Sequence, residues 1–342
     1  MRQVIFLMLF FFVASVAVVT GKALQEAEKS VLLNVSYDVI RDFYKEYNPL
    51  FRRFYQTQQG EDFMISQSHG GASKQVLSVA NGLPADVVTL TQTNDIEVLV
   101  GKGLVAADWA QALPNNAVPF GSVMVLLVKK GNPKRIYDWS DLVRENVKVI
   151  FANPKTSANG RFAYLSAFAY AERAFPDEQQ VHDFMRRLLR NVPVLEAGAR
   201  GATISFTKRN LGDVLIAPEN EAALAAQAFG ADSFEVIYPS YSAYTPVLVA
   251  EVNKNTAMNG TQQQARAYLR YLWSEPAQEL AAKKYFRPSN EKIFKKYTAL
   301  FPSVETFDVN EKFGNWQTIN QRHFVDNALF DRLYIAAQNI KE

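Results

Sequence analysis

Four short segments of the chain carry the residue types that can receive an anion. They lie at residues 36–38, 68–74, 156–161 and 198–203, and each follows a strand-like run and opens a helix-like run. The first turn of a helix presents backbone N–H groups without an intrahelical partner, and the helix dipole favours a negative ligand there. Each such hydrogen bond contributes on the order of 1 kcal/mol, and more with a charged partner. Four turns of this kind that meet in one cleft predict an oxyanion site.

The turn at residues 153–161 is the clearest of the four. Residues 147–152 are short and β-branched, as in a buried strand, and residues 162–174 place apolar side chains at helical spacing. The Thr, Ser and Asn side chains between these two runs are typical of a helix N-terminus. An ordinary capped helix without a ligand is the alternative for this turn considered alone.

Other chemistries have weaker support. The sequence contains neither a G-x-S-x-G nucleophile elbow nor a G-x-x-x-x-G-K-[ST] phosphate loop. His69, His182 and His323 have no second His or Cys at metal-ligand spacing, so structural roles are favoured, and for His69 a hydrogen bond that orients its turn. Glu219 and Glu221 favour a helix start, where acidic side chains complement the dipole, over a catalytic pair.

Strand-like and helix-like runs alternate along most of the chain. This order predicts an α/β protein with mostly parallel sheets covered by helices. Pro49 is expected to kink or divide the first helix, Asn94 to cap a helix that ends near Val100, and the chain from Thr261 onward to be almost wholly helical. Strands are expected at residues 31–38, 62–67, 85–90, 121–130, 147–152, 192–197, 213–217, 234–239 and 245–252.

Two of the expected strands, 121–130 and 245–252, are long enough to cross between two lobes. They predict a discontinuous first lobe, residues 24–120 and 246–342, and a second lobe, residues 121–245. Ligands of open α/β sheets bind at the carboxyl ends of the strands, where the strand-to-helix turns lie. The cleft between the lobes is therefore the expected site.

Composition and the N-terminus exclude several classes of protein. Lys plus Arg at 37 and Asp plus Glu at 34 give a formal charge of +3, too small to indicate a nucleic-acid surface. An apolar run of about sixteen residues follows Arg2, which predicts a secretory signal peptide at residues 1–23, with an uncleaved anchor as the alternative. The absence of cysteine excludes disulfides and a lipid-modified Cys. A periplasmic protein fits these features.

Several separated motifs make the chain resemble the periplasmic sulfate-binding proteins. The resemblance implies a type II periplasmic binding protein with two lobes, each a mixed sheet flanked by helices, which closes over sulfate or thiosulfate and delivers it to the permease of an ABC importer. It further implies a monomer without catalysis, cofactor or metal. The motifs, with ranges in this sequence, are Leu-Leu-Asn-Val-Ser-Tyr-Asp at 32–38, Gln-Ser-His-Gly-Gly at 67–71, Asn-Pro-Lys at 153–155, Gly-Ala-Arg-Gly at 198–201 and Glu-Asn-Glu-Ala at 219–222.

The resemblance also assigns ligand positions, which are mostly neutral donors. Arg200 is expected to support the site rather than to form a direct salt bridge with the anion. The positions in contact with the anion are the backbone near Asp38, the turn at Ala72 and Ser73, the hydroxyl of Ser157, and the N–H groups of Ala158, Asn159 and Ala199.

Three departures from the family pattern bear on the ligand. Ala72 stands where the family usually has a Ser, and Ala158 and Asn159 stand where it has two glycines. Pro218 replaces a Trp whose indole N–H donates to the anion, and Pro supplies no donor. Loss of two donors at roughly 1 to 1.5 kcal/mol each weakens sulfate binding by one to two powers of ten, and the smaller side chain leaves room for thiosulfate.

Three alternatives remain open at this point. Phosphate, molybdate or tungstate could be the ligand, and phosphate gains if the Asp38 carboxylate faces it, because a protonated oxyanion needs an acceptor. An extracytoplasmic enzyme on the same fold would use His69 or Glu219 as acid or base. A cation binder of related architecture would need Tyr37, Tyr164 and Tyr241 to converge, which their spacing does not require.

Overall fold

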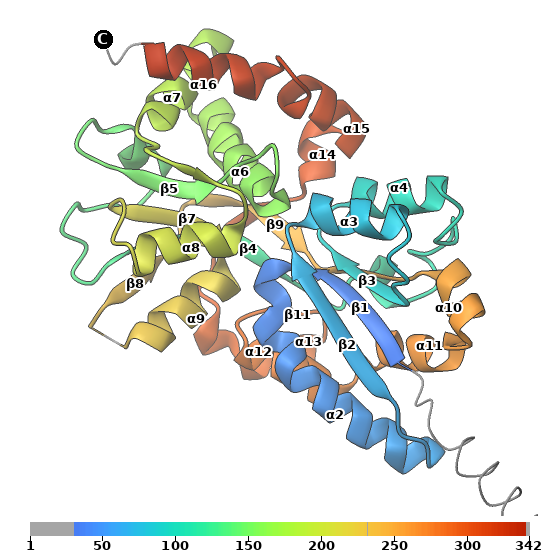
Figure 1. Cartoon of the computed structure of the whole chain (residues 1–342). Coiled ribbons are helices and arrows are strands. Elements are labelled where there is room, and N and C mark those ends of the chain that lie inside the picture. The colour runs from blue at the N-terminus through green and yellow to red at the C-terminus, as the bar shows by residue number, and fades with distance from the viewer. Residues whose placement is uncertain (1–30, 231, 340–342) are drawn as a thin grey trace, which may run out of the picture.

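The chain forms two β-sheets, each with helices on both sides (Figure 1). The computed structural model describes residues 31–230 and 232–339. The predicted signal peptide at residues 1–23 therefore lies outside the described residues. Two mixed sheets flanked by helices confirm the expected α/β class.

The first sheet has four strands in the order β10-β3-β1-β2. The central strand β1 is parallel to both β2 and β3, and β10 is antiparallel to β3. Burial on both faces explains the near-continuous apolar character of β1 and β3. The strands are β1 Val31–Tyr37, β2 Met64–Gly70, β3 Val87–Leu90 and β10 Leu248–Glu251.

The second sheet has eight strands, six of them in the order β12-β9-β4-β7-β5-β6, while β8 and β11 pair with β4 outside that order. The long strand β4 is antiparallel to β7, β8 and β9, and β5 is parallel to β6 and β7. The strands are β4 Phe120–Lys129, β5 Val149–Ala152, β6 Leu195–Glu196, β7 Val214–Pro218, β8 Phe234–Ile237, β9 Tyr241–Pro246, β11 Arg287–Pro288 and β12 Glu305–Phe307.

The helices connect successive strands and carry most of the chain beyond β10. Three short 3₁₀ segments, η1 Asp38–Ile40, η2 Trp139–Val143 and η3 Thr298–Leu300, and one π segment, η4 Asn320–Phe324, complete the described secondary structure. The helices are α2 Arg41–Gln59, α3 Ala72–Ala80, α4 Thr93–Gly101, α5 Pro114–Ala117, α6 Ala158–Ala174, α7 Glu178–Arg190, α8 Ala199–Thr207, α9 Glu219–Phe229, α10 Asn253–Asn259, α11 Gln262–Tyr271, α12 Glu275–Lys283, α13 Glu291–Lys296, α14 Val309–Phe313, α15 Trp316–Ile319 and α16 Leu329–Asn339.

Two separate groups of core residues define two packing units. Unit I contains the four-stranded sheet and the core residues from Leu32 to Phe120 and from Val247 to Phe286. Unit II contains the eight-stranded sheet and its cores, which extend from Val123 through Ile216 and Ala243. The chain passes between the units next to Phe120, at Val247, whose N–H donates to the Phe120 carbonyl at 3.0 Å, and again after Phe286.

The last helices pack in unit II. Trp316, Phe330 and Leu333 are buried in the same core as α6 and α7, and α16 lies along α7 (Figure 1). The sequence predicts residues 246–342 as part of the first lobe. The amphipathic pattern of a helix does not indicate which of two sheets the helix covers, so this packing could not be predicted. The lobe boundaries remain a prediction.

Three local expectations differ from the structure. Helix α2 continues past Pro49 undivided, because Phe43, Tyr47, Phe51 and Tyr55 bury one continuous face of it. Strand β2 extends to Gly70 through the expected turn, because its register with β1 continues to that residue. The expected strand 245–252 is two strands in different sheets, separated after Pro246.

The N-cap of α4 lies two residues before the expected Asn94. The helix begins at Thr93, and its N-cap is Gln92. The predicted helix itself is present. Residues 241–244, which lie between two of the expected strands, belong to strand β9, which pairs with β4 and β12.

Candidate functional site

The N-terminus of α6 forms one side of the candidate site. Ser157 is the N-cap, and its Oγ accepts a hydrogen bond from Gly160 N at 3.2 Å. Ala158 and Asn159 are the first two helical residues, so no intrahelical carbonyl accepts their N–H groups. Gly160 is required here, because a Cβ would lie 2.4 Å from the Ala152 carbonyl oxygen. The predicted trio of residues 157–159 is fully buried and presents donors at a helix start.

The N-terminus of α8 meets η1 across the boundary between the units. Asp38 Oδ2 accepts a hydrogen bond from Arg200 N at 3.2 Å. Gly198 permits this approach, because a Cβ there would lie 2.8 Å from the same oxygen. Ala199, the first residue of α8, is buried, and Arg200 is exposed. Burial raises the pKa of Asp38, although the backbone N–H groups of Arg200, Asp38 and Val39 lower it.

The N-terminus of α3 lies against the loop before α6. Ala72 is buried and Ser73 half-buried at the first two helical positions. Gly71 precedes them, and a Cβ on it would lie 3.4 Å from the Thr156 carbonyl oxygen. Gln75 Nε2 donates to the carbonyl of Ser36 at 3.2 Å, which ties α3 to the end of β1.

His69 has the orienting role expected of it. Its Nδ1 and the Ser36 hydroxyl are 2.6 Å apart. Burial and, to a smaller extent, the nearby Arg41 lower its pKa to about 4, although Asp42 raises it. The ring is therefore neutral at pH 7 and holds β1 and β2 together where both end.

Three helix N-termini and the end of β1 thus meet between the units. Ala152, Ala158 and Ala199 of unit II are buried in the core cluster of unit I, so the boundary is closed at this point. The first turns of α3, α6 and α8 present backbone N–H groups, and the Ser157 hydroxyl lies at the start of α6. These N–H groups belong to Ala72, Ser73, Ala158, Asn159 and Ala199. The arrangement offers neutral donors to an anion, and the direct ligand positions remain a prediction.

Pro218 ends β7 and is the N-cap residue of α9. It faces Met124 of β4 and supplies no donor. Asn220, two residues further on, is buried, and its Nδ2 lies 3.5 Å from the Val39 carbonyl of unit I. Its Oδ1 has no hydrogen-bond partner among the described residues. The sequence alone indicates no role for Asn220 beyond its place in the first turn of α9. Its contact with η1 is visible only in the tertiary structure.

The two glutamates at the start of α9 are held by arginines. Glu219 accepts from Arg287 at 2.7 and 2.9 Å, and Glu221 accepts from Arg200 at 3.1 Å. Both carboxylates are fully buried, and burial raises the pKa of each while its arginine lowers it. These pairs give both residues structural roles.

A further polar contact between the units was not predicted. Arg161 Nη1 donates to Gln92 Oε1 at 2.9 Å, and its Nε donates to the Pro154 carbonyl at 2.9 Å. Asp95 of α4 is buried nearby, and burial raises its pKa to about 6 although Arg161 lowers it. Asp95 Oδ2 has no hydrogen-bond partner in the described part of the chain. No sequence signal could identify this cluster, since its members belong to different units.

The geometry does not support the cation-binder alternative. Tyr37 lies in the core of unit I, whereas Tyr164 and Tyr241 pack in unit II, so the three do not converge. Among residues 31–230 and 232–339, no group of three or more His, Cys, Asp and Glu side chains is placed to hold a metal ion.

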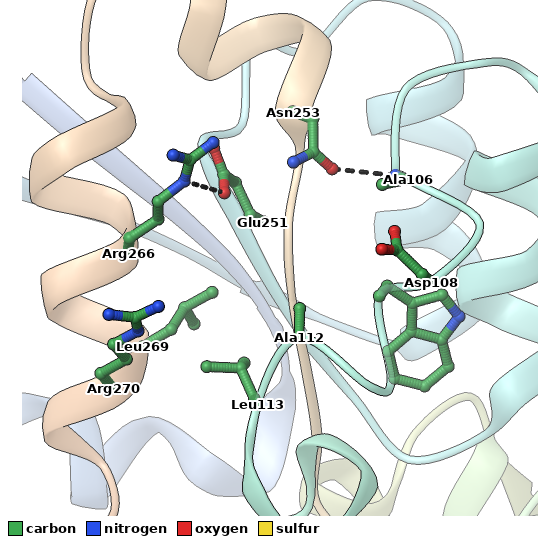
Figure 2. A pocket seen from close by; sticks show the side chains of 10 residues that line it. Ala106, Asp108, Ala112, Leu113, Glu251, Asn253, Arg266, Leu269 and Arg270 are labelled. Carbon is green, nitrogen blue, oxygen red and sulfur yellow. Dashed lines mark hydrogen bonds and ion pairs between the residues drawn. The ribbon is translucent and has the colours of Figure 1, made fainter.

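A pocket of about 260 Å³ lies away from the candidate site, between α11 and the loop after α4 (Figure 2). Trp109, Arg270 and the ion pair of Arg266 with Glu251 line it. None of the predicted anion-site residues takes part in it. Arg266 and Arg270 therefore line a surface separate from the anion turns.

Comparisons with known proteins identify the class of protein to which the chain belongs. Residues 35–287 match the model of the bacterial extracellular solute-binding protein family. The thiosulfate-binding protein of Pseudomonas aeruginosa is 49% identical over 89% of this chain and 92% of its own length. The sulfate-binding protein of Escherichia coli K12 is 45% identical over 88% of this chain and 92% of its own. The structure of the sulfate-binding protein SubI from Mycobacterium tuberculosis has 29% identity and a TM-score of 0.76, covering 86% of this chain and all of that chain.

The fold and the buried donors define a solute-binding protein, a class without catalytic activity. Within that class, the chain belongs to the family of sulfate- and thiosulfate-binding proteins of ABC importers. None of the described helices is long and apolar enough to cross a membrane.

Proposed function

We propose that this protein binds sulfate or thiosulfate in the periplasm and delivers it to the membrane permease of an ABC importer. The observation that carries the proposal is the meeting of the N-termini of α3, α6 and α8 at the boundary between the units. Such a site neutralises a fully ionised anion with backbone dipoles instead of a bound cation. The relatives from Pseudomonas aeruginosa and Escherichia coli support this ligand class.

The direction of the Asp38 carboxylate supports discrimination against phosphate. One of its oxygens already accepts from Arg200 N, so it is engaged with α8. A site of donors offers nothing to the proton of hydrogen phosphate, whereas sulfate and thiosulfate carry no proton at neutral pH. We therefore expect phosphate to bind far more weakly than either sulfur oxyanion.

Pro218 and Ala72 support thiosulfate as a ligand at least as good as sulfate. Both residues supply fewer donors than the family pattern, and neither has a large side chain that would exclude the terminal sulfur of thiosulfate. The predicted first lobe, residues 24–120 and 246–342, and the predicted second lobe, residues 121–245, would be the two lobes that close on the anion. The helices after β12 pack with unit II.

Calorimetry on ligand-stripped protein tests this proposal, with sulfate, thiosulfate, phosphate, molybdate and tungstate as the panel. We expect micromolar or tighter binding of sulfate and thiosulfate by a monomer and none of phosphate at comparable concentrations. Nanomolar sulfate binding with thiosulfate excluded would contradict the ligand preference. Tight phosphate binding would contradict the donor-only site.

A further inference from the structure

The loop that precedes α6 is held from behind by the C-terminal segment of the chain. Lys155 lies two residues before Ser157, and its Nζ contacts Asp331 Oδ2 at 2.9 Å and Asp326 Oδ1 at 3.0 Å. Lys155 and Asp331 are each 24% exposed, whereas Asp326 is 96% exposed. Asp331 is therefore the partner that solvent screens less.

Further hydrogen bonds fix both ends of this ion pair. Lys155 N donates to Asn153 Oδ1 at 2.9 Å, so the side chain of Asn153 sets the turn from which Lys155 projects. Asn327 N donates to the same Asp331 oxygen at 2.9 Å. Burial lowers the pKa of Lys155, but its hydrogen bonds to Asp331 and Asp326 outweigh that effect and raise it.

Aromatic packing makes the C-terminal segment a firm support. Trp316 meets Phe162 edge-on with ring centroids 5.4 Å apart, and Tyr164 packs against Phe324 and Phe330 at 5.5 and 5.6 Å. The Arg161 guanidinium lies 5.5 Å from the centre of the Phe324 ring. The segment from Trp316 to Asp331 thus contacts the first turns of α6 and the loop that leads into it.

We propose that Lys155 and Asp331 are a positioning pair that holds loop 154–157 in the conformation in which Ser157, Ala158 and Asn159 face the anion. The loop has little regular structure of its own, so its shape depends on such contacts. Donors that are already in place bind an anion more tightly than donors that must be ordered on binding. The inference rests on the proposed function of this site.

The other end of α6 offers a matched control. Lys312 of α14 contacts Glu172 of α6 at 3.2 Å, with exposures of 26% and 29%, and Arg322 lies 4.0 Å from the same carboxylate. This cluster joins the same C-terminal segment to the same helix with similar exposure. It lies near the last residue of α6, Ala174, far along the helix from Ser157.

The experiment compares Lys155→Met, Lys155→Arg, Asp331→Asn and Lys312→Met by calorimetry of sulfate and thiosulfate binding, with thermal unfolding of each ligand-free protein. We expect Lys155→Met and Asp331→Asn to weaken binding of both anions by about tenfold, which corresponds to about 1.4 kcal/mol. Lys155→Arg should retain most of the affinity. Lys312→Met should bind both anions like the wild type. We expect all four variants to unfold at similar temperatures.

Two outcomes would overturn the positioning role. One is binding by Lys155→Met and Asp331→Asn within twofold of the wild type. The other is an equal loss in Lys312→Met, which would make the effect one of general stability. A wild-type protein that binds neither anion would instead contradict the proposed function itself, so the two failures are distinguishable.

Discussion

Two arginines of unit II reach unit I at different places along the boundary, and their surroundings differ. Arg200 has a 47% exposed side chain, pairs with Glu221 of its own unit and lies 3.6 Å from Asp42 of unit I. Arg161 has no carboxylate within salt-bridge distance among the described residues, and it donates to the neutral Gln92 and to Pro154. Burial lowers the pKa of Arg161, whereas the carboxylates of Glu221 and Asp42 outweigh burial and raise that of Arg200.

The comparison shows how the same residue type can join two units in different ways. At Arg200, water and salt screen the attraction between the units, so the contact across the boundary is weak. At Arg161, the medium is poorly polarisable, so each lost hydrogen bond leaves a buried group without compensation. Changes at Arg161 should therefore have larger effects that depend less on salt.

The largest expected effect is that of Arg161→Met. It removes both hydrogen bonds and the positive charge that lowers the pKa of Asp95. We expect sulfate affinity to fall by roughly ten- to a hundredfold, because a buried partner left unpaired costs about 1 to 3 kcal/mol. Calorimetry measures the change, with Arg161→Lys as a control that keeps the charge. Retention of wild-type affinity by Arg161→Met would remove the distinction between the two contacts.

Asp95→Asn tests the electrostatics of the same contact through pH. The pKa of Asp95 in the folded protein is about 6, above its unfolded value of about 3.9. Its protonated form therefore stabilises the fold below about pH 4, and this contribution is lost as the pH rises through about 6. The loss amounts to roughly 3 kcal/mol.

Chemical denaturation in saturating sulfate from about pH 4 to pH 8 measures this slope. Asp95→Asn should flatten it and be more stable than the wild type at pH 8. Identical pH profiles for the two proteins would show that Asp95 is not a buried acid in the liganded protein.

Asp42→Asn should have a smaller effect at the exposed contact. The variant keeps the pair of Arg200 with Glu221 and removes only the partner in unit I. We expect sulfate affinity to fall by about twofold at low ionic strength, and the difference to vanish in about 0.5 M sodium chloride. A salt-independent loss of tenfold or more would place this contact in the same class as that of Arg161.

His323→Phe should have no effect on anion binding. His323 is buried among Phe168, Phe313 and Phe324, with Tyr164 Oη 3.4 Å from its Nδ1. Burial, Arg322 and His182 lower its pKa to about 3. The neutral ring therefore stabilises the fold above about pH 6.5, and this contribution is lost as the pH falls towards 3.

Acid unfolding of ligand-free protein, compared with calorimetry at pH 7, tests this separation from the boundary. The variant should lose less stability than the wild type between about pH 6.5 and pH 4. Weaker sulfate binding in His323→Phe would show that the core of unit II is coupled to the site.

The sequence predicted much of the local structure around the candidate site. Ser157, one of the expected capping residues, is the N-cap of α6, and the turns at Gly71 and Gly198 open helices as predicted. Caps, turns and apolar periodicity are properties of a few adjacent residues, so they can be recognised without knowledge of the rest of the chain. The direction of the Asp38 carboxylate could not be predicted, because the donor that it meets is 162 residues away.

The sequence by itself determined the alternation of strands and helices, the hydrogen-bond donors at the helix starts and the family to which the chain belongs. Only the tertiary structure decided that residues 245–252 divide between two sheets, that the last helices cover unit II, and which side chains cross the boundary. The contact of Arg161 with Gln92 spans 69 residues, and that of Lys155 with Asp331 spans 176. Local patterns are set by the nearest neighbours in the chain, whereas such contacts depend on how two packed units meet.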